Sequence, residues 1–193
     1  MYEFIEGEIV ELTPAYVVLQ AGPVAYMIQV SLNTYSQLNG RNSGRIYIHF
    51  VVKEDAHVLY GFSGREEREI FRLLISVSGV GANTARLILS SMPPYEVQQA
   101  IMSGNVVALQ SIKGIGAKSA QRIIVDLRDK IGKTALKDDL ILYQDNTGRE
   151  EALSALVALG FPRKTVEKHL ASILSKQPDL TVEEMVKAAL KLM

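Results

Sequence analysis

Two glycine-containing segments carry the residue types and spacing best suited to binding chemistry in this sequence. The segment Val77–Ala85 aligns with Ile112–Ala120, with both glycines and both alanines in register. Glycine permits tight turns and close approach of a second backbone. A helix that begins directly after such a turn presents N–H groups without intrahelical partners, and its dipole favours an anion there. The duplicated segments therefore predict two helix–hairpin–helix motifs that bind DNA phosphates without reading base sequence.

Two other glycine-rich loops can be excluded by spacing. A dinucleotide-binding loop follows a strand and has a third glycine, but Thr84 or Ser119 occupies that position here and a helical pattern precedes each copy. A P-loop has glycine directly before its Lys-Ser pair, whereas Ala117 precedes Lys118. A pair of purely structural helix connections remains the alternative to DNA binding, and the duplication beside a basic segment favours DNA.

The charge distribution supports an anionic ligand at the centre of the chain. Lys plus Arg number 21 and Asp plus Glu also number 21, so the formal net charge is zero. Residues 64–133, however, contain ten basic and six acidic side chains, while residues 1–63 contain three basic and six acidic ones. The middle of the chain is therefore basic between two mildly acidic ends, as expected of a segment that binds a polyanion.

Catalytic and metal-binding patterns are missing from the sequence. With no cysteine in its 193 residues, the chain has no disulfide, thiolate metal site or cysteine nucleophile. Its three histidines, His49, His57 and His169, match no protease or hydrolase motif. Apolar runs fall short of the roughly 18 residues of a membrane span, and the N-terminus lacks a basic signal region. The sequence therefore predicts a cytoplasmic, non-catalytic protein without metal, cofactor or membrane contact.

The elements that position the hairpins follow from periodicity. Short β-type segments dominate the first 62 residues, separated by turn residues; they are Phe4–Leu12, Tyr16–Ala21, Val24–Ser31, Arg45–Val52 and His57–Phe62. Five such strands predict a small Greek-key barrel of the oligonucleotide-binding (OB) type. An SH3-like barrel fits the same pattern.

From Arg65 onward the apolar period is helical. The central helices expected are Arg65–Ser76, Ala82–Ser91, Tyr95–Ser103, Val106–Ser111 and Ala117–Lys130. The C-terminal ones are Glu150–Leu159, Pro162–Leu174 and Val182–Leu192, with Pro162 in a first turn and a capping box at Thr181–Glu184. We therefore predict an α+β multidomain chain: an OB-like barrel over 1–63, an all-α tandem hairpin domain over 64–132, a flexible linker over 133–148 and a three-helix domain over 149–193.

The order of these parts resembles the RuvA family of Holliday-junction-binding subunits over the whole chain. The barrel segment Phe50–Phe62, the two hairpins, and the ubiquitin-associated-like helix–Gly–aromatic turn Leu156–Phe161 carry the resemblance. It implies a subunit without ATPase activity of its own, assembled as a homotetramer, with one or two tetramers on a four-way DNA junction. It also implies that residues 149–193 dock on a RuvB-type AAA+ ATPase hexamer and that a RuvC-type resolvase is a further partner.

The resemblance assigns roles to particular residues. The implied DNA-binding residues are Gly79, Val80, Gly81, Gly114, Ile115, Gly116, Lys118 and Arg122. Glu54 and Asp55 match an acidic pin that points into the junction centre. Asn83 departs from the family, in which a lysine is common at this position, so the first hairpin should contribute less electrostatic attraction.

The acidic pair allows other interpretations from the residues alone. Glu54 and Asp55 could form a solvated hairpin turn or act as metal ligands in a nuclease. The alternative function is therefore a structure-selective DNA repair nuclease that uses the tandem hairpins to hold DNA. Such an enzyme would need a metal-binding acidic cluster, and the sequence shows none in a recognisable arrangement.

Overall fold

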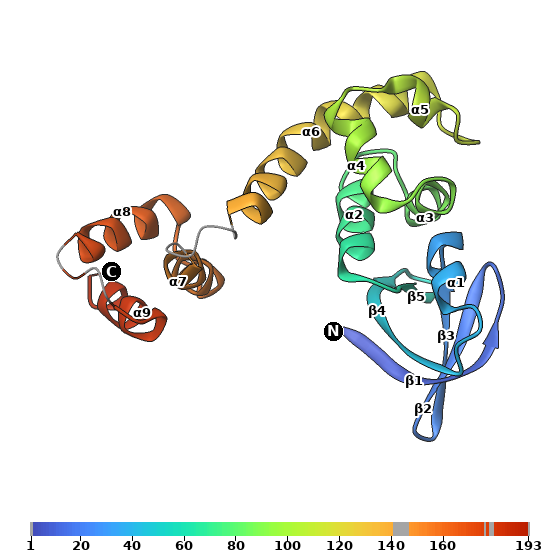
Figure 1. Cartoon of the computed structure of the whole chain (residues 1–193), viewed down its shortest axis with the longest axis horizontal. Helices are drawn as coiled ribbons and strands as arrows, with labels where there is room; N and C mark the ends of the chain where they lie inside the picture. Colours follow the sequence, from blue (N-terminus) through green and yellow to red (C-terminus); the bar gives the residue numbers. More distant parts are fainter. Residues whose placement is uncertain (1, 141–146, 176, 178–179, 193) are drawn as a thin grey trace. The chain divides into compact units, whose positions relative to one another are not determined.

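Figure 1 shows a computed structural model of the protein, which describes all residues except 1, 141–146, 176, 178–179 and 193. The chain forms two compact units, Met1–Lys133 and Thr134–Met193, which are described separately below. Among the described residues, none of the helices has the length and apolar character needed to cross a membrane.

The first unit begins with a closed five-stranded barrel. Its strands are β1 (Phe4–Leu12), β2 (Tyr16–Ala21), β3 (Val24–Val30), β4 (Ser43–Val52) and β5 (His57–Phe62). They are ordered β1-β2-β3-β5-β4, and only the β3–β5 pair is parallel. Inward-pointing residues alternate along the strands, as the period of two requires, and those at the centre of the barrel, such as Val17, Ile28 and Ile46, are fully buried. The predicted barrel and its strand bounds are confirmed to within two residues.

A short helix between β3 and β4, α1 (Leu32–Leu38), was not expected from the sequence. Ser31 caps it by accepting a hydrogen bond from the Thr34 N–H at 3.0 Å, and Leu38 is buried in the barrel core. Seven residues that include Asn, Thr and Ser give little helical periodicity, so only the capping serine pointed to this helix.

Five helices follow the barrel, and the last of them ends in the second unit. They are α2 (Arg65–Ile75), α3 (Ala82–Ser91), α4 (Pro94–Met102), α5 (Val106–Gln110) and α6 (Ala117–Leu140). Four match their predicted bounds to within one residue, but α6 continues past Lys130 into the predicted linker. Helix-forming residues follow Gly132, and one internal glycine costs only about 1 kcal/mol, which does not end a helix. Residues 141–146 of that predicted linker lie outside the described residues, and its last two residues, 147–148, already belong to the next helix, which begins three residues before the predicted Glu150.

Strand β5 shares an apolar core with the helices, while the barrel interior forms a separate buried cluster. Tyr60 and Phe62 of β5 pack against Phe71 of α2, with ring centroids 5.2 and 4.9 Å apart. Both β5 residues belong to the same buried cluster as the hairpin helices rather than to the barrel interior. The last strand of the barrel is therefore also part of the hairpin domain's core.

After the end of α6, the described residues of the second unit form three helices, α7 (Thr147–Ala158), α8 (Arg163–Leu174) and α9 (Val182–Leu190). They bury a small core that includes Leu153, Leu156 and Leu170. The predicted capping box is present, and the hydrogen bond from the Thr181 N–H lowers the pKa of Glu184. Pro162 lies at the N-cap of α8, one position before the predicted first turn.

Candidate nucleic-acid interface

The two predicted hairpins have the same backbone conformation. In the first, the Val80 N–H donates to the Val77 carbonyl at 3.0 Å, and in the second the Ile115 N–H donates to the Ile112 carbonyl at 3.1 Å. Gly79 and Gly114 have φ of +89° and +90°, in the left-handed region that favours glycine. The sequence repeat is therefore a structural repeat as well.

The apolar residue between each pair of glycines points into the protein. Val80 and Ile115 are only 6% and 5% exposed and lie in the core of the hairpin domain. These side chains fill the space between the flanking helices. Of the predicted DNA-binding residues, these two can therefore offer a ligand only backbone groups.

The outer side of each hairpin is open. A Cβ atom built on Gly79, Gly81, Gly114 or Gly116 would meet no other atom within 4 Å. Gly81 is extended, with φ −85° and ψ 169°, a conformation that any residue adopts, and it caps α3 without a side-chain hydrogen bond. No contact with the described part of the chain therefore requires glycine at position 81, whereas a second backbone lying against the hairpin would.

Exposed cations surround the second hairpin. Lys118 and Arg122 lie in the first two turns of α6, and Arg122 approaches the carboxylate of Asp126 at 3.9 Å. More than half of the Arg122 side chain is exposed, so this pair leaves the guanidinium available to a phosphate. Lys113, beside Gly114, is a further exposed cation that sequence reasoning did not single out, although its place in the hairpin was visible in the repeat.

The first hairpin uses the equivalent positions differently. Asn83, which aligns with Lys118, accepts a hydrogen bond from the Tyr60 hydroxyl at 3.2 Å. One turn further along α3, Arg86 donates to the Ala15 carbonyl and to Gln29 Oε1, both at 2.9 Å. Sequence reasoning missed these contacts because they join α3 to barrel residues far away in the chain.

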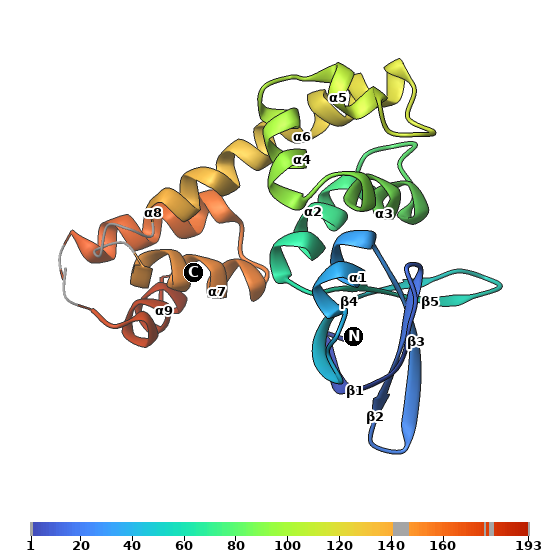
Figure 2. The ribbon, with the colours of Figure 1, turned by 45° about the vertical axis from the view of Figure 1, so that its right-hand side comes forward.

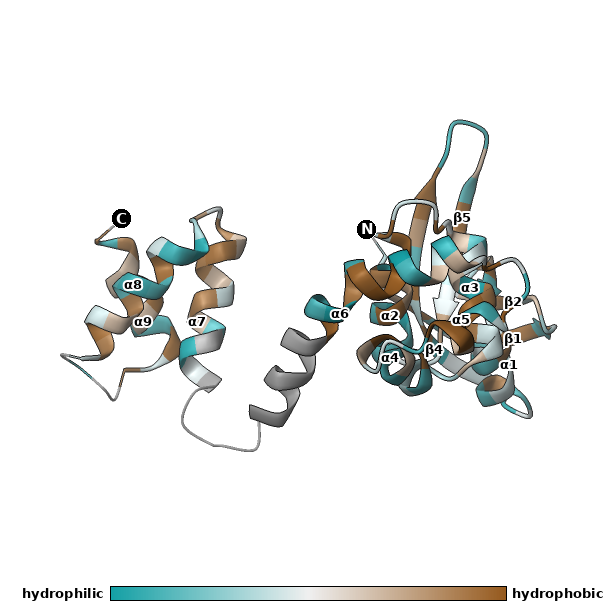
Figure 3. Cartoon of the chain, turned by 90° about the horizontal axis from the view of Figure 1, so that it is seen from above, coloured by the Kyte–Doolittle hydropathy of each residue, from teal (hydrophilic) through white to brown (hydrophobic). Residues whose placement is uncertain are grey.

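Glu54 and Asp55 lie at the tip of the β4–β5 hairpin and are exposed. The last pair of the ladder is Val52 with His57, and the Lys53 N–H donates to the Ala56 carbonyl at 2.8 Å. This turn projects from the barrel and has a hydrophilic tip (Figure 3). The turn and the loops of both hairpins reach toward the same side in the view of Figure 2.

Glu67 and Arg68, two consecutive buried residues of α2, hold the barrel to the helices. The hydroxyls of Ser31 and Thr34 donate to the Glu67 carboxylate, and burial raises the pKa of Glu67. Arg68 donates to the Glu3 carbonyl at 2.8 Å and pairs with the Glu3 carboxylate at 2.6 Å. The hydrogen bond from Arg68 lowers the pKa of Glu3.

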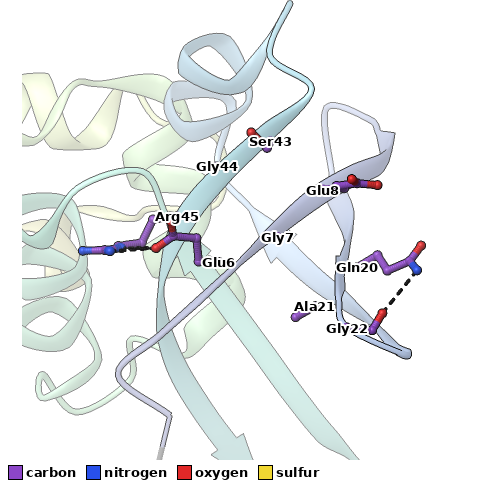
Figure 4. Close-up of a pocket in the computed structure, with 9 residues that line it drawn as sticks. All are labelled: Glu6, Gly7, Glu8, Gln20, Ala21, Gly22, Ser43, Gly44 and Arg45. Carbon is purple, nitrogen blue, oxygen red and sulfur yellow. Dashed lines mark hydrogen bonds and ion pairs between the residues drawn. The ribbon is translucent and has the colours of Figure 1, made fainter.

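A hollow on the barrel surface contains none of the predicted site residues (Figure 4). It lies where β1 passes between β2 and β4, and Gly7 is required there because a Cβ would come within 2.0 Å of the Gln20 carbonyl oxygen. Glu6 and Arg45, which line it, pair with each other at 2.7 Å. This hollow therefore has no connection to the hairpins or the acidic turn.

The requirements of a nuclease are not met in the part of the chain that the structure describes. It holds no group of three or more His, Cys, Asp or Glu side chains that could bind a metal ion. The described residues thus offer hairpins that suit a phosphate backbone, but no metal centre that would cleave it.

Comparison with known proteins agrees with this arrangement. Residues 1–61 match the family model described as the RuvA N terminal domain, residues 71–129 a SAM-like helix-hairpin-helix tandem, and residues 147–193 the RuvA C-terminal domain. Among the similar proteins are two named "Holliday junction branch migration complex subunit RuvA". The one from Christiangramia forsetii is 49% identical over 99% of both chains, and the one from Parabacteroides distasonis is 48% identical over 100% of both. The chain belongs to the RuvA family.

Proposed function

We propose that this chain is the junction-binding subunit of a DNA branch-migration complex. The observation that carries the proposal is the pair of hairpins with matching hydrogen bonds and open glycine faces. The relatives' name, which places them in a Holliday junction branch migration complex, supports it. In this role the protein works in the cytoplasm without catalysing a reaction itself, and the energy for migration comes from a separate ATPase.

Each hairpin suits one stretch of phosphate backbone. The N–H groups at the start of α3 and α6 bind phosphate oxygens, and Gly81 and Gly116 allow the DNA backbone to come close. Lys118 and Arg122 add charge at the second hairpin. Because these contacts reach phosphates rather than base edges, binding depends on DNA shape and not on base sequence.

The acidic turn contributes selectivity in a symmetric assembly. In a homotetramer on a four-way junction, four copies of Glu54 and Asp55 meet at the centre, where the arms exchange strands. Their carboxylates repel phosphates over about 8 Å at physiological salt, which favours separated strands over an intact duplex. One tetramer covers one face of the open junction, and a second covers the other face in an octamer.

The second unit docks the motor, a RuvB-type AAA+ ATPase hexamer. Its α8 and α9 border a groove that contains the apolar side chains Ile173, Leu180 and Leu192. Lys187, Lys191 and Glu184 also line that groove, and Lys187 pairs with Glu183 at 2.6 Å, so the groove suits a partner segment through its apolar side chains. A RuvC-type resolvase acts on the same junction as a further partner.

The test is a binding experiment with the full chain, Mg²⁺ and no ATP. A synthetic four-way junction and a linear duplex of equal length are titrated separately and then analysed for cleavage. The proposal predicts a retarded, uncut junction bound more tightly than the duplex, and cleaved arms would contradict it. Native mass spectrometry with and without the junction then distinguishes a tetramer from an octamer.

A further inference from the structure

The sequence repeat supplies an internal comparison between the two hairpins. Arg86, in the helix after the first hairpin, aligns with Gln121 in the helix after the second. Gln121 is exposed, yet the second hairpin has the same turn and the same hydrogen bonds as the first. The hairpin motif itself therefore does not need an arginine at this position.

Arg86 instead contacts the barrel. Its Nη1 donates to the Ala15 carbonyl and to Gln29 Oε1 at 2.9 Å, and it lies 3.5 Å from the Val30 carbonyl. Ala15 precedes β2, and the other two acceptors end β3. The Val30 N–H already donates to the Ala15 carbonyl at 3.0 Å, so the guanidinium attaches α3 to one end of the β2–β3 pair. Arginine suits this task because it stays charged and offers several donors in a rigid plane.

Two neighbours on the same face of α3 continue this attachment. Asn83 accepts from the Tyr60 hydroxyl at 3.2 Å, and Ser90 Oγ accepts from the Leu32 N–H at 3.0 Å. Positions 83, 86 and 90 are three and four residues apart, which places them in one row along the helix. We call this row the α3 clamp. It attaches the helix to β5, to the end of the β2–β3 pair and to the start of α1, while Gly81 at the start of the helix remains exposed.

The clamp is connected to the acidic turn through one strand. Tyr60 belongs to β5, and β5 begins at His57, directly after the turn that carries Glu54 and Asp55. The first hairpin and the acidic turn are thus attached to the same short strand. The distance between the phosphate-binding loop and the carboxylates therefore depends on how firmly α3 is attached to this part of the barrel.

We propose that Arg86 is a positioning residue that determines selectivity for four-way junctions, by holding the first hairpin at a set distance from the acidic turn. This inference rests on the junction-binding function proposed above. A junction must meet the hairpins and the turn at the same time, so preorganisation lowers the entropy cost of binding it. A linear duplex can bind the hairpins alone and gains nothing from the fixed distance.

The first experiment measures selectivity in two Arg86 variants. Arg86→Gln introduces the residue of the second repeat, and Arg86→Lys keeps the positive charge without the planar donor set. Gln121→Ala, at the equivalent position of the second hairpin, is the matched control. We expect both Arg86 variants to bind the four-way junction about tenfold more weakly, the order of one lost charge-assisted hydrogen bond. Duplex affinity should stay within about twofold for Arg86→Lys, and the control should match the parent.

The second experiment measures the distance itself without DNA. The chain has no cysteine, so spin labels can be placed at Lys53→Cys and Ser78→Cys, near the turn and in the first hairpin. With unlabelled chain in excess, electron paramagnetic resonance reports the distance distribution within one chain. Arg86→Lys should broaden it. Tyr60→Phe removes only the hydroxyl that donates to Asn83, and it should also broaden the distance distribution. This variant replaces the arginine variants in the test if they do not fold.

The outcomes separate the inference from the proposed function. An unchanged distance distribution in the folded variants, or an equal loss of junction and duplex affinity in Arg86→Lys, would overturn the positioning role. If the parent itself bound junctions no more tightly than duplex, the proposed function would fail. The α3 clamp would still be shown to fix the distance between the hairpin and the turn if the variants broadened the distance distribution.

Discussion

The clearest prediction exchanges the residues at the equivalent positions of the two hairpins. Lys118→Asn gives the second hairpin the residue that the first has at Asn83. Each phosphate contact by a cation contributes about 0.9 to the slope of log affinity against log salt concentration. With one Lys118 per chain and four chains in the proposed tetramer, the slope should flatten by between about three and four units. Between roughly 50 and 200 mM salt, the parent should then lose about a hundredfold more affinity than the variant.

The assay is fluorescence anisotropy with a labelled four-way junction at five or so salt concentrations. Asn83→Lys is the reciprocal variant, and it should steepen the slope by a similar amount. It also removes the acceptor of the Tyr60 hydroxyl, so its affinity extrapolated to high salt should fall below that of the parent. Equal slopes in the parent and in Lys118→Asn would show that Lys118 is only a solvated surface lysine, and the phosphate-contact reasoning would be wrong.

Three further predictions concern other parts of the molecule. Glu54→Gln with Asp55→Asn should leave the fold intact and raise duplex affinity, so the ratio of duplex to junction dissociation constants should fall. An unchanged ratio would show that these two residues form only a solvated turn. A fragment of residues 1–133 should still bind junctions but fail to stimulate the motor, and full ATP-driven migration by that fragment would refute the docking role of residues 149–193. Because burial raises the pKa of Glu67, its ionisation costs stability as the pH rises above the ordinary glutamate value of 4.5. Urea unfolding should therefore show the parent losing stability relative to Glu67→Gln as the pH is raised above 4.5, and parallel curves would contradict this.

Local patterns predicted much of this structure. The strand bounds followed from alternation and turn residues, and the two hairpins followed from the repeated glycines, since φ near +90° at Gly79 and Gly114 leaves little choice of residue. The exceptions have local causes too. α1 is too short and polar to show a period, and α6 passes through a polar stretch without a proline to stop it.

The attachments between the barrel and the helices could not be predicted in the same way. Glu67 and Arg68 stand in the charged run Arg65–Glu69, which has the composition of a solvated helix face, yet both are buried. Arg86 meets Ala15 across 71 positions of the chain. Periodicity reports only which side of an element is apolar, so it carries no information on contacts of this range. The hairpins were therefore predictable, whereas the clamp that orients the first one required the structure.

The shared core of β5 and α2 has a consequence for how the protein folds during synthesis. β1 closes the barrel only by pairing with β4, and the buried aromatic rings of Tyr60 and Phe62 are covered only when Phe71 arrives. As the chain leaves the ribosome, a barrel ending at residue 63 would expose these rings to water. We expect the nascent barrel to remain incomplete until α2 and α3 have emerged, and the whole of Met1–Lys133 then to fold in a single cooperative transition.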